Sequence, residues 1–219
     1  GWLFDYTHPD YVIHLACRSG GVGANFRYPG GLMYENLNMS LKIIEEARQY
    51  NVKKIVTTAD IACYPASCPI PYVEHDFWNG YPHAVKCHYA IAKRTITDLL
   101  AAYKRQFGMD SVTLICSDIY GPEDEFDPHA GKIIPAALTE ARFAAENNTP
   151  QFVSRGNSKS TRDFIYVEDC ARAVILALEN NDIPDLINVG TGLETRIQDL
   201  ILQICQDFEY EGKMLWDEA

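Results

Sequence analysis

Short apolar runs alternate with helical stretches through the first half of this chain. The runs are residues 11–17, 54–58 and 112–116, each bounded by polar residues. Apolar residues recur at helical spacing over 33–50 and 89–107, and Asn51 and Gly108 are typical helix-ending residues. Runs that are apolar throughout are typical of strands buried on both faces of a parallel sheet. The alternation predicts an α/β fold, a doubly wound parallel sheet whose ligand lies along the edge where the strands end.

The second half, beyond Pro122, has a different pattern. Helices are predicted over residues 132–147, from Glu168 onward and over 197–208, with extended segments at 151–154, 161–167 and 186–189. We therefore expect two domains, residues 1–122 and 123–219, with residues 156–192 partly returning to the first.

The composition argues against several classes of partner. The chain has 219 residues, 47% of them hydrophobic, and a formal net charge of −11 without a Lys/Arg-rich run, which argues against nucleic acid and anionic membranes. Apolar runs such as residues 170–178 are far shorter than the ~20 residues of a membrane span, and no signal-peptide pattern is visible. Seven cysteines without a Cys-x-x-Cys pair predict reduced thiols, a cytoplasmic location and no metal site.

Tyr89 and Lys93 stand four residues apart in a predicted helix, so their side chains share one face. A phenol normally titrates near ~10, and an adjacent ammonium group favours its ionised form. We therefore expect Lys93 to lower the pKa of Tyr89, which would suit an acid or base. Alone, the spacing is also compatible with a surface tyrosine lying on a lysine stem.

Gly20, Gly21 and Gly23 follow the first apolar run and could be taken for a dinucleotide phosphate loop. The Gly-x-Gly-x-x-Gly pattern needs a small residue where Phe26 stands, and a helix that opens there. We expect residues 28–31, Tyr-Pro-Gly-Gly, to break the chain instead. The segment is therefore interpreted as a ligand-facing loop, and the phosphate-binding turn itself as absent from these residues.

Longer motifs occur in a characteristic order along the chain. They are Val12-Ile-His-Leu-Ala16, Tyr34-Glu-Asn36, Cys63-Tyr-Pro65, Trp78-Asn-Gly-Tyr-Pro82, Tyr89-Ala-Ile-Ala-Lys93, Ile119-Tyr-Gly-Pro122, Ile133-Ile-Pro135, Arg162-Asp-Phe-Ile-Tyr-Val-Glu-Asp169 and Asn188-Val-Gly-Thr-Gly192. In this order they resemble the extended short-chain dehydrogenase/reductase family, also described as NAD-dependent epimerases/dehydratases, and within it the GDP-L-fucose synthase branch. The resemblance covers nearly the whole chain.

The resemblance implies a fold and an activity. Residues 1–122 would be part of a Rossmann domain that binds NADP, or else NAD, and residues 123–219 part of a smaller domain that holds a nucleoside diphosphate sugar, with a GDP-sugar favoured. Family members carry a glycine-rich turn ahead of the first apolar run, so we expect the N-terminal part of the Rossmann domain to be missing and the substrate domain to be truncated. The implied activity is NADP-dependent epimerisation and reduction of a 4-keto-6-deoxy nucleotide sugar by a homodimer.

The resemblance also assigns roles to individual residues. Tyr89 becomes the proton donor or acceptor, and Lys93 lowers its pKa while binding the nicotinamide ribose. Cofactor contacts fall on Ala16, Asn36, Tyr89, Lys93, Cys116, Asp118 and Ile119. Substrate contacts fall on Gly21, Asn25, Lys132, Arg155 and Arg162. Arg162 faces the nucleotide end unless it pairs with an acid such as Asp163, and Lys132 is either a site acid or a solvated lysine.

Several catalytic positions depart from the family pattern. Asp60 stands where the family has a serine or threonine, and Ala62 stands where it has the cysteine used in epimerisation. A register shift would give the first role to Thr58, and a bulge would give the second to Cys63. Without either, epimerisation is expected to be lost, because inversion needs an acid and a base on opposite faces of the sugar.

Other departures leave two functions open. Lys132 replaces the family histidine, Asp118 an asparagine and Arg155 a tryptophan. Tyr89 and Lys93 favour a nucleotide-sugar reductase or epimerase, or an incomplete copy of one. The altered positions favour a non-catalytic member of the family that binds nucleotide as a sensor or subunit.

Overall fold

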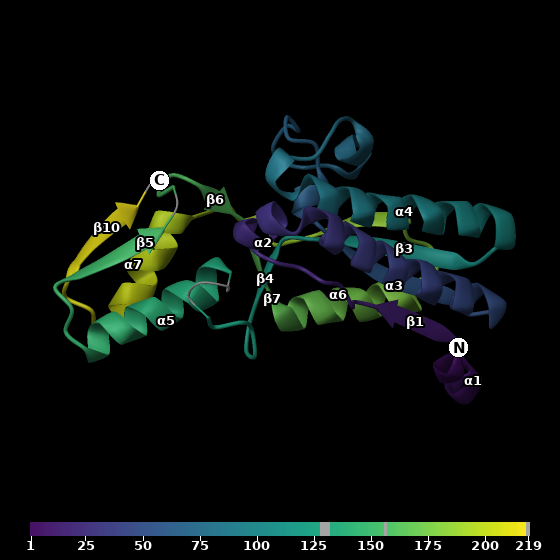
Figure 1. The fold of residues 1–219 in the computed structure, drawn as a ribbon, viewed down its shortest axis with the longest axis horizontal. Helices are drawn as coiled ribbons and strands as arrows, with labels where there is room; N and C mark the ends of the chain where they lie inside the picture. Colours follow the sequence, from purple (N-terminus) through teal and green to yellow (C-terminus); the bar gives the residue numbers. More distant parts are fainter. Residues whose placement is uncertain (128–131, 156, 218–219) are drawn as a thin grey trace. The chain divides into compact units, whose positions relative to one another are not determined.

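A computed structural model describes residues 1–127, 132–155 and 157–217 (Figure 1). The chain divides into two compact units, of which unit 1 comprises Gly1–Ser117 and Glu168–Val189. Unit 2 comprises Asp118–Val167 and Gly190–Ala219. The first division thus falls after residue 117, where the sequence predicted 122, and the returning segment is shorter than the predicted 156–192.

Unit 1 contains a parallel sheet with the strand order β1-β2-β3-β8. The strands are β1 (Tyr11–His14), β2 (Lys54–Asp60), β3 (Asp110–Cys116) and β8 (Leu186–Val189). The predicted α/β fold is confirmed, and the three apolar runs are neighbouring parallel strands as predicted. Because these strands run in one direction, their carboxyl ends meet at one edge of the sheet.

Several helices surround this sheet. They are α1 (Trp2–Thr7), α2 (Val22–Arg27), α3 (Pro29–Gln49), α4 (Cys87–Phe107) and α6 (Val167–Glu179), with short 3-10 helices η1 (Ile61–Cys63), η2 (Glu74–Trp78) and η3 (Ala84–Lys86). α3 and α4 run side by side (Figure 1), and Ile44, Ile55 and Leu100 form a buried core between them and β2. Each such buried side chain stabilises the fold by about 1.5–3 kcal/mol. α4 ends at Gly108, whose φ of 71° is the left-handed conformation that glycine adopts without strain.

The prediction of a strand buried on both faces is wrong for the first apolar run. β1 has four residues and, within the described part of the chain, pairs only with β2. Tyr11 and Ile13 are therefore 49% and 40% exposed, whereas Val56 on the more central β2 is fully buried. An apolar run identifies a strand, but its burial also depends on neighbours on both sides.

The start of α3 also differs from the prediction. α2 begins directly after Gly21, and α3 begins at Pro29, so the Tyr-Pro-Gly-Gly segment opens a helix and does not break the chain. Proline is tolerated there because its missing N–H has no helical partner in the first turn. Gly31 leaves room for the ring of Tyr28, since a Cβ at Gly31 would lie 1.9 Å from Tyr28 Cε1.

Unit 2 contains α5 (Ile133–Glu146), α7 (Ile197–Asp207) and paired short strands. β5 (Gln151–Arg155) pairs in parallel with β10 (Lys213–Asp217), β4 (Asp118–Tyr120) in parallel with β7 (Phe164–Tyr166), and β6 (Thr161–Arg162) antiparallel with β9 (Thr195–Arg196). Ala141, Phe152 and Ile201 belong to a core that joins α5, β5 and α7. The apolar periodicity of the second half therefore corresponds to a separate core.

No helix within the described ranges is long and apolar enough to cross a membrane. The same ranges contain no group of three or more His, Cys, Asp or Glu side chains arranged to hold a metal ion.

Candidate active site

Lys86, Tyr89 and Lys93 form a stripe at the start of α4. Lys86 immediately precedes the helix, and spacings of three and four residues place the side chains on one face. Lys93 Nζ donates a hydrogen bond to the main-chain oxygen of Thr58 (3.0 Å), and Lys86 Nζ lies 3.9 Å from Asp60 Oδ2. Tyr89 therefore stands between two contacts with the end of β2. This is the sheet edge where the sequence predicted a ligand.

Tyr89 is buried, and its phenol is a weak acid. Burial raises the pKa of Tyr89 above its ordinary value, and neighbouring Cys17, Asp60 and Cys63 raise it further. The direction is opposite to the predicted effect of Lys93, because desolvation dominates and the ammonium group contacts the main chain of β2. At neutral pH the phenol is therefore protonated and suited to donate a proton.

A neutral histidine lies beneath this stripe. His14 is 5% exposed, its Nε2 shares a hydrogen bond with Ser40 Oγ (2.9 Å), and Thr57 Oγ1 donates to its main-chain oxygen (3.1 Å). Burial, reinforced by the charge of Lys93, lowers the pKa of His14 to about 4. His14 therefore adds no second positive charge beside Lys93. The sequence signal for this site was a single polar residue inside an apolar run.

Asn36 holds the exposed segment that follows β1. Its Oδ1 accepts a hydrogen bond from Arg18 N (2.8 Å), and its Nδ2 donates to the main-chain oxygens of Arg18 and Leu32 (both 2.8 Å). Both amide hydrogens are thus used within the protein, so Asn36 positions this segment, and its contact with a cofactor stays a prediction. Ala16, which Asn36 helps to position, is exposed at the carboxyl end of β1.

Gly21 and Asn25 lie beside the start of α4. Asn25 is buried, and its Nδ2 donates to the main-chain oxygens of Gly20 (2.8 Å) and Gly21 (3.1 Å). α2, which carries Asn25, packs against η3 and therefore against the segment that ends in Lys86. The predicted substrate loop thus lies next to the stripe, with Asn25 fixing its backbone.

The strand that leads to the predicted catalytic positions is regular. β2 pairs with β3 without interruption as far as Asp60, so the strand itself contains no bulge. Asp60, which the ungapped resemblance assigns to the family serine position, accepts a hydrogen bond on its Oδ1 from Ala62 N (2.7 Å) at the start of η1. Thr58 contributes its main-chain oxygen to Lys93.

The two cysteines predicted to serve the site are core residues. Cys63 is fully buried, and burial raises the pKa of its thiol to about 12. Cys116 is 4% exposed, and contact with Cys170 (Sγ to Sγ 3.6 Å), followed by burial, raises its pKa. Burial therefore argues against the predicted catalytic role of Cys63, and the Sγ of Cys116 contacts Cys170 on α6.

Arg94, which the sequence did not single out, ties together the loop between η1 and α4. It is 6% exposed, and it donates to the main-chain oxygens of Cys63 and Gly80 (2.7 Å each). Its guanidinium group also lies 5.3 Å from the ring centre of Phe77 and 5.8 Å from that of Trp78. The main chain of this loop is thus anchored to α4 at Cys63 and at Gly80.

In unit 2, Asp118 and Arg162 form an ion pair, with Arg162 Nε 3.6 Å from Asp118 Oδ2. Asp163, the partner suggested by the sequence, instead accepts hydrogen bonds from the main chain of Thr191 (3.0 Å) and Gly192 (2.9 Å). The carboxylate of Asp118, which stands where the family has an asparagine, is therefore partly neutralised by an adjacent cation. The Arg162 side chain is 42% exposed and keeps donors open to solvent.

The remaining predicted residues of unit 2 differ in accessibility. Lys132 is exposed immediately before α5, and its Nζ donates to the main-chain oxygen of Ile119 (3.3 Å). Arg155 ends β5, and its side chain lies outside the described residues. Ile119 contributes its carbonyl to Lys132, so its predicted cofactor contact would involve other atoms.

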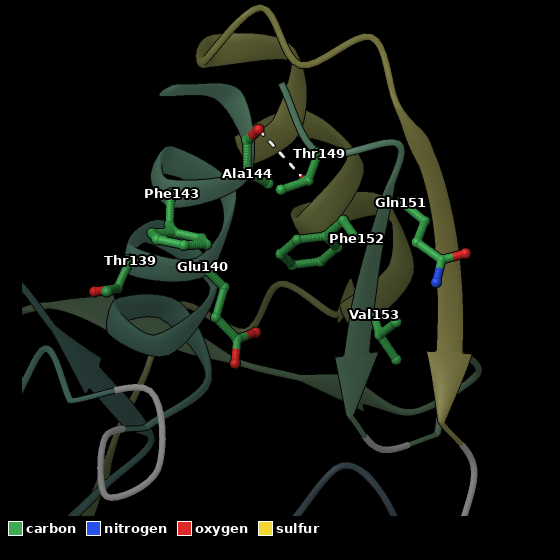
Figure 2. A pocket seen from close by; sticks show the side chains of 8 residues that line it. All are labelled: Thr139, Glu140, Phe143, Ala144, Thr149, Gln151, Phe152 and Val153. Carbon is green, nitrogen blue, oxygen red and sulfur yellow. Dashed lines mark hydrogen bonds between the residues drawn. The ribbon is translucent and has the colours of Figure 1, made fainter. Parts of the chain in front are cut away.

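Unit 2 also has surface grooves that contain none of the predicted site residues. One, of about 340 Å³, lies between α5 and β5 and is lined by Thr139, Glu140, Phe143, Ala144, Thr149, Gln151, Phe152 and Val153 (Figure 2). Figure 2 shows Phe143 and Phe152 on opposite sides of the groove, with the side chain of Glu140 extending below their rings. Among the predicted catalytic residues, the contacts bring Lys93 and Thr58 together at the end of β2, beside Asp60, in unit 1.

Comparisons with known proteins agree with the geometry of unit 1. A model of the NAD dependent epimerase/dehydratase family matches residues 2–190. A GDP-L-fucose synthase of Escherichia coli (strain K12) is 33% identical over 219 residues, covering 96% of this chain and 68% of the relative. A GDP-L-fucose synthase of Dictyostelium discoideum is 32% identical and covers 99% of this chain and 68% of the relative.

A solved structure gives the same result for the fold. A GDP-L-fucose synthetase from Naegleria fowleri, determined with NADP bound, superposes with a TM-score of 0.89 at 27% identity. The match covers 99% of this chain and 68% of that one. The chain spans about two thirds of the length of the curated relatives that it matches, from 61% to 69% of each.

Proposed function

We propose that this chain, which belongs to the NAD-dependent epimerase/dehydratase family, is part of an NADP-dependent reductase. Its substrate is a 4-keto-6-deoxy nucleotide sugar, with a GDP-sugar favoured. The observation that carries the proposal is the position of Tyr89 between the Lys86–Asp60 and Lys93–Thr58 contacts at the carboxyl edge of the sheet. The printed names of relatives, which are GDP-L-fucose synthases, support the sugar class. The NADP-bound Naegleria structure supports the cofactor.

The residues present fit the nicotinamide end of such a cofactor. Lys93 uses one of its three N–H donors on Thr58, so two can reach ribose oxygens. The main chain around Ala16 is exposed at the end of the neighbouring strand β1 and can accept a flat ring. Bound NADPH supplies the hydride for reduction of a ketone.

Tyr89 completes the reduction by donating its phenolic proton to the keto oxygen. The raised pKa keeps that proton in place until the oxygen becomes basic during the reaction. The phenolate that remains lies one helical turn from Lys93, whose positive charge stabilises it. Solvent then returns the proton, and the sugar leaves as an alcohol.

Epimerisation has no comparable support in this chain. The family resemblance assigns the reactive thiol to the position of Ala62, which carries a methyl group, and Cys63 beside it is fully buried. Lys132 stands at the other epimerisation position, where the family has histidine. We therefore propose reduction of the 4-keto group without inversion at C3 or C5.

The test is NADPH oxidation by the full-length protein with GDP-4-keto-6-deoxymannose. Tyr89→Phe removes the donor and should lower turnover by about 10²-fold or more, with NADPH affinity nearly unchanged. Tyr103→Phe is the matched control on the same helix, because Tyr103 Oη donates to Glu45 (3.0 Å) away from the site. Equal turnover of wild type and Tyr89→Phe would remove Tyr89 from the mechanism. A wild type that binds nucleotide without oxidising NADPH would favour the non-catalytic sensor.

A further inference from the structure

Asp60 offers an open acceptor at the edge where Tyr89 stands. It is the last residue of β2, and its side chain is 32% exposed. Oδ1 accepts the hydrogen bond from Ala62 N, whereas Oδ2 lies 3.9 Å from Lys86 Nζ, beyond hydrogen-bond length. One carboxylate oxygen is therefore fixed by the fold and the other remains able to accept a hydrogen bond from a ligand.

Lys86 supplies the donors that a carboxylate lacks. A serine or threonine hydroxyl both donates and accepts, whereas an ionised aspartate only accepts and an ammonium group only donates. Together, Asp60 and Lys86 present both kinds of group where the family has one hydroxyl. Lys86 also offsets the negative charge, so the pair can face a polar ligand without a net charge of its own.

The position of the pair fixes which ligand atoms it can reach. Lys86, the N-cap residue of α4, precedes Tyr89 by three residues, and Asp60 follows Thr58, the partner of Lys93, by two residues on β2. A ketone oxygen that receives a proton from Tyr89 therefore has the pair as its neighbour. Substituents on the adjacent ring carbon come next to the open oxygen of Asp60.

We propose that Asp60 and Lys86 bind the hydroxyl group on the ring carbon adjacent to the keto carbon, so that this protein selects 4-keto sugars that retain a 3-hydroxyl over 3-deoxy sugars. The sugar hydroxyl donates to Asp60 Oδ2 and accepts from Lys86 Nζ. The inference rests on the proposed reductase function and adds a specificity determinant to it.

The experiment compares two substrates on the full-length protein, GDP-4-keto-6-deoxymannose and the same nucleotide sugar without its 3-hydroxyl. NADPH oxidation gives kcat/KM for each. A hydrogen bond to a charged group should make wild type prefer the 3-hydroxy sugar by about 10- to 100-fold. Asp60→Asn, which can still cap η1 through its amide oxygen, should lower kcat/KM for the 3-hydroxy sugar about 10-fold more than for the 3-deoxy sugar, so the preference shrinks about 10-fold.

Two further variants keep the test decisive. Lys86→Met leaves the cap of η1 intact and should also reduce the preference, so it replaces Asp60→Asn if that variant does not fold. Asp98→Asn removes an exposed carboxylate elsewhere on α4 and should leave the preference unchanged. An unaltered preference in Asp60→Asn and Lys86→Met overturns this inference while the reductase function stands. Absence of NADPH oxidation by wild type with both sugars overturns the reductase function and this inference with it.

Discussion

The two ends of β2 carry charged residues in contrasting environments. At the first position, Lys54 is 1% exposed, donates to the main-chain oxygen of Asn180 (2.6 Å) and lies 3.6 Å from Asp110. At the last position, Asp60 is partly exposed and only loosely paired with Lys86. One strand thus carries a buried, satisfied cation at its amino end and an open pair at its carboxyl end. Satisfied charges stabilise the fold, whereas unsatisfied ones are available to a ligand.

The amino-end network extends beyond Lys54. Lys104 lies 2.9 Å from Asp110 and 2.6 Å from Asp185, which connects α4, β3 and the segment before β8. Burial opposes ionisation of Asp110, but the hydrogen bond and charge of Lys104 outweigh it and lower the pKa of Asp110. The aspartate is therefore charged when the protein is folded at neutral pH, as its role in holding two lysines requires.

The largest expected loss of stability is at Lys54. Lys54→Met keeps most of the side-chain volume but leaves the Asn180 carbonyl without its donor and Asp110 with one cation fewer. We expect the free energy of unfolding to fall by about 2–3 kcal/mol. Urea denaturation of Lys54→Met and Asp60→Asn compares the stabilising roles of the two ends of β2. The free energy of unfolding of Asp60→Asn should fall by less than about 0.5 kcal/mol. Equal losses of unfolding free energy in the two variants would show that the two ends of β2 contribute equally to stability.

A smaller effect is expected from acid, through His14. Its folded-state pKa of about 4 lies below its ordinary value of 6.5, so the unfolded chain takes up a proton first as the pH falls. The contribution of neutral His14 to the free energy of unfolding is complete above the unfolded-state pKa and is lost progressively between pH 6.5 and 4. The free energy of unfolding should therefore fall by about 2 kcal/mol between pH 7 and 5. His14→Gln should flatten this dependence in denaturation curves measured across that range. An unchanged pH dependence in the variant would mean that His14 is not the group that titrates.

Acid should weaken the ion pairs at the amino end of β2 at a lower pH than it affects His14. Because the pKa of Asp110 is lowered, its contribution is present above the ordinary aspartate value near ~3.9 and is lost as the pH falls through the folded-state value. The two ends of the sheet should therefore lose stability in separate pH ranges, with the carboxyl end first.

A smaller loss of stability than at Lys54 is expected at Lys104, whose side chain is 40% exposed. Lys104→Gln removes two ion pairs that solvent already screens, so the loss should stay below about 1 kcal/mol. Urea denaturation in low and high salt provides the check, since the wild-type advantage should shrink as salt is added. A loss as large as that of Lys54→Met would show that exposure does not separate the two lysines.

Local patterns predicted the framework of the site better than its side-chain environments. The stripe of Tyr89 and Lys93 followed from spacing on one helix, and the strand edge followed from short apolar runs. Burial could not be predicted in the same way, because Cys63 and Cys116 are enclosed by segments distant in the sequence. The use of both Asn36 amide hydrogens likewise depends on a loop that folds back onto α3.

Lys86 and Pro29 lie in sequence patterns that indicate their places in the structure. Lys86 precedes Tyr89 by three residues, so the rule that paired Tyr89 with Lys93 also places Lys86 on their face. The expected break at Pro29 was wrong because a proline in a first helical turn favours the start of a helix as much as it disfavours continuation. Arg94 carried no pattern of its own, since its partners are two main-chain oxygens of a long loop.

Reduction without epimerisation can be observed in the reaction of the full-length protein with GDP-4-keto-6-deoxymannose and NADPH in D₂O, with the product examined by proton NMR. A reaction without protein controls for spontaneous exchange of the acidic C3 and C5 protons. Because Tyr89 can donate a proton while Ala62 offers no thiol and Cys63 is buried, we predict a reduced C4 that bears a hydroxyl group, with hydrogen retained at C3 and C5. Deuterium and inversion at C3 or C5, or no oxidation of NADPH at all, would contradict the account.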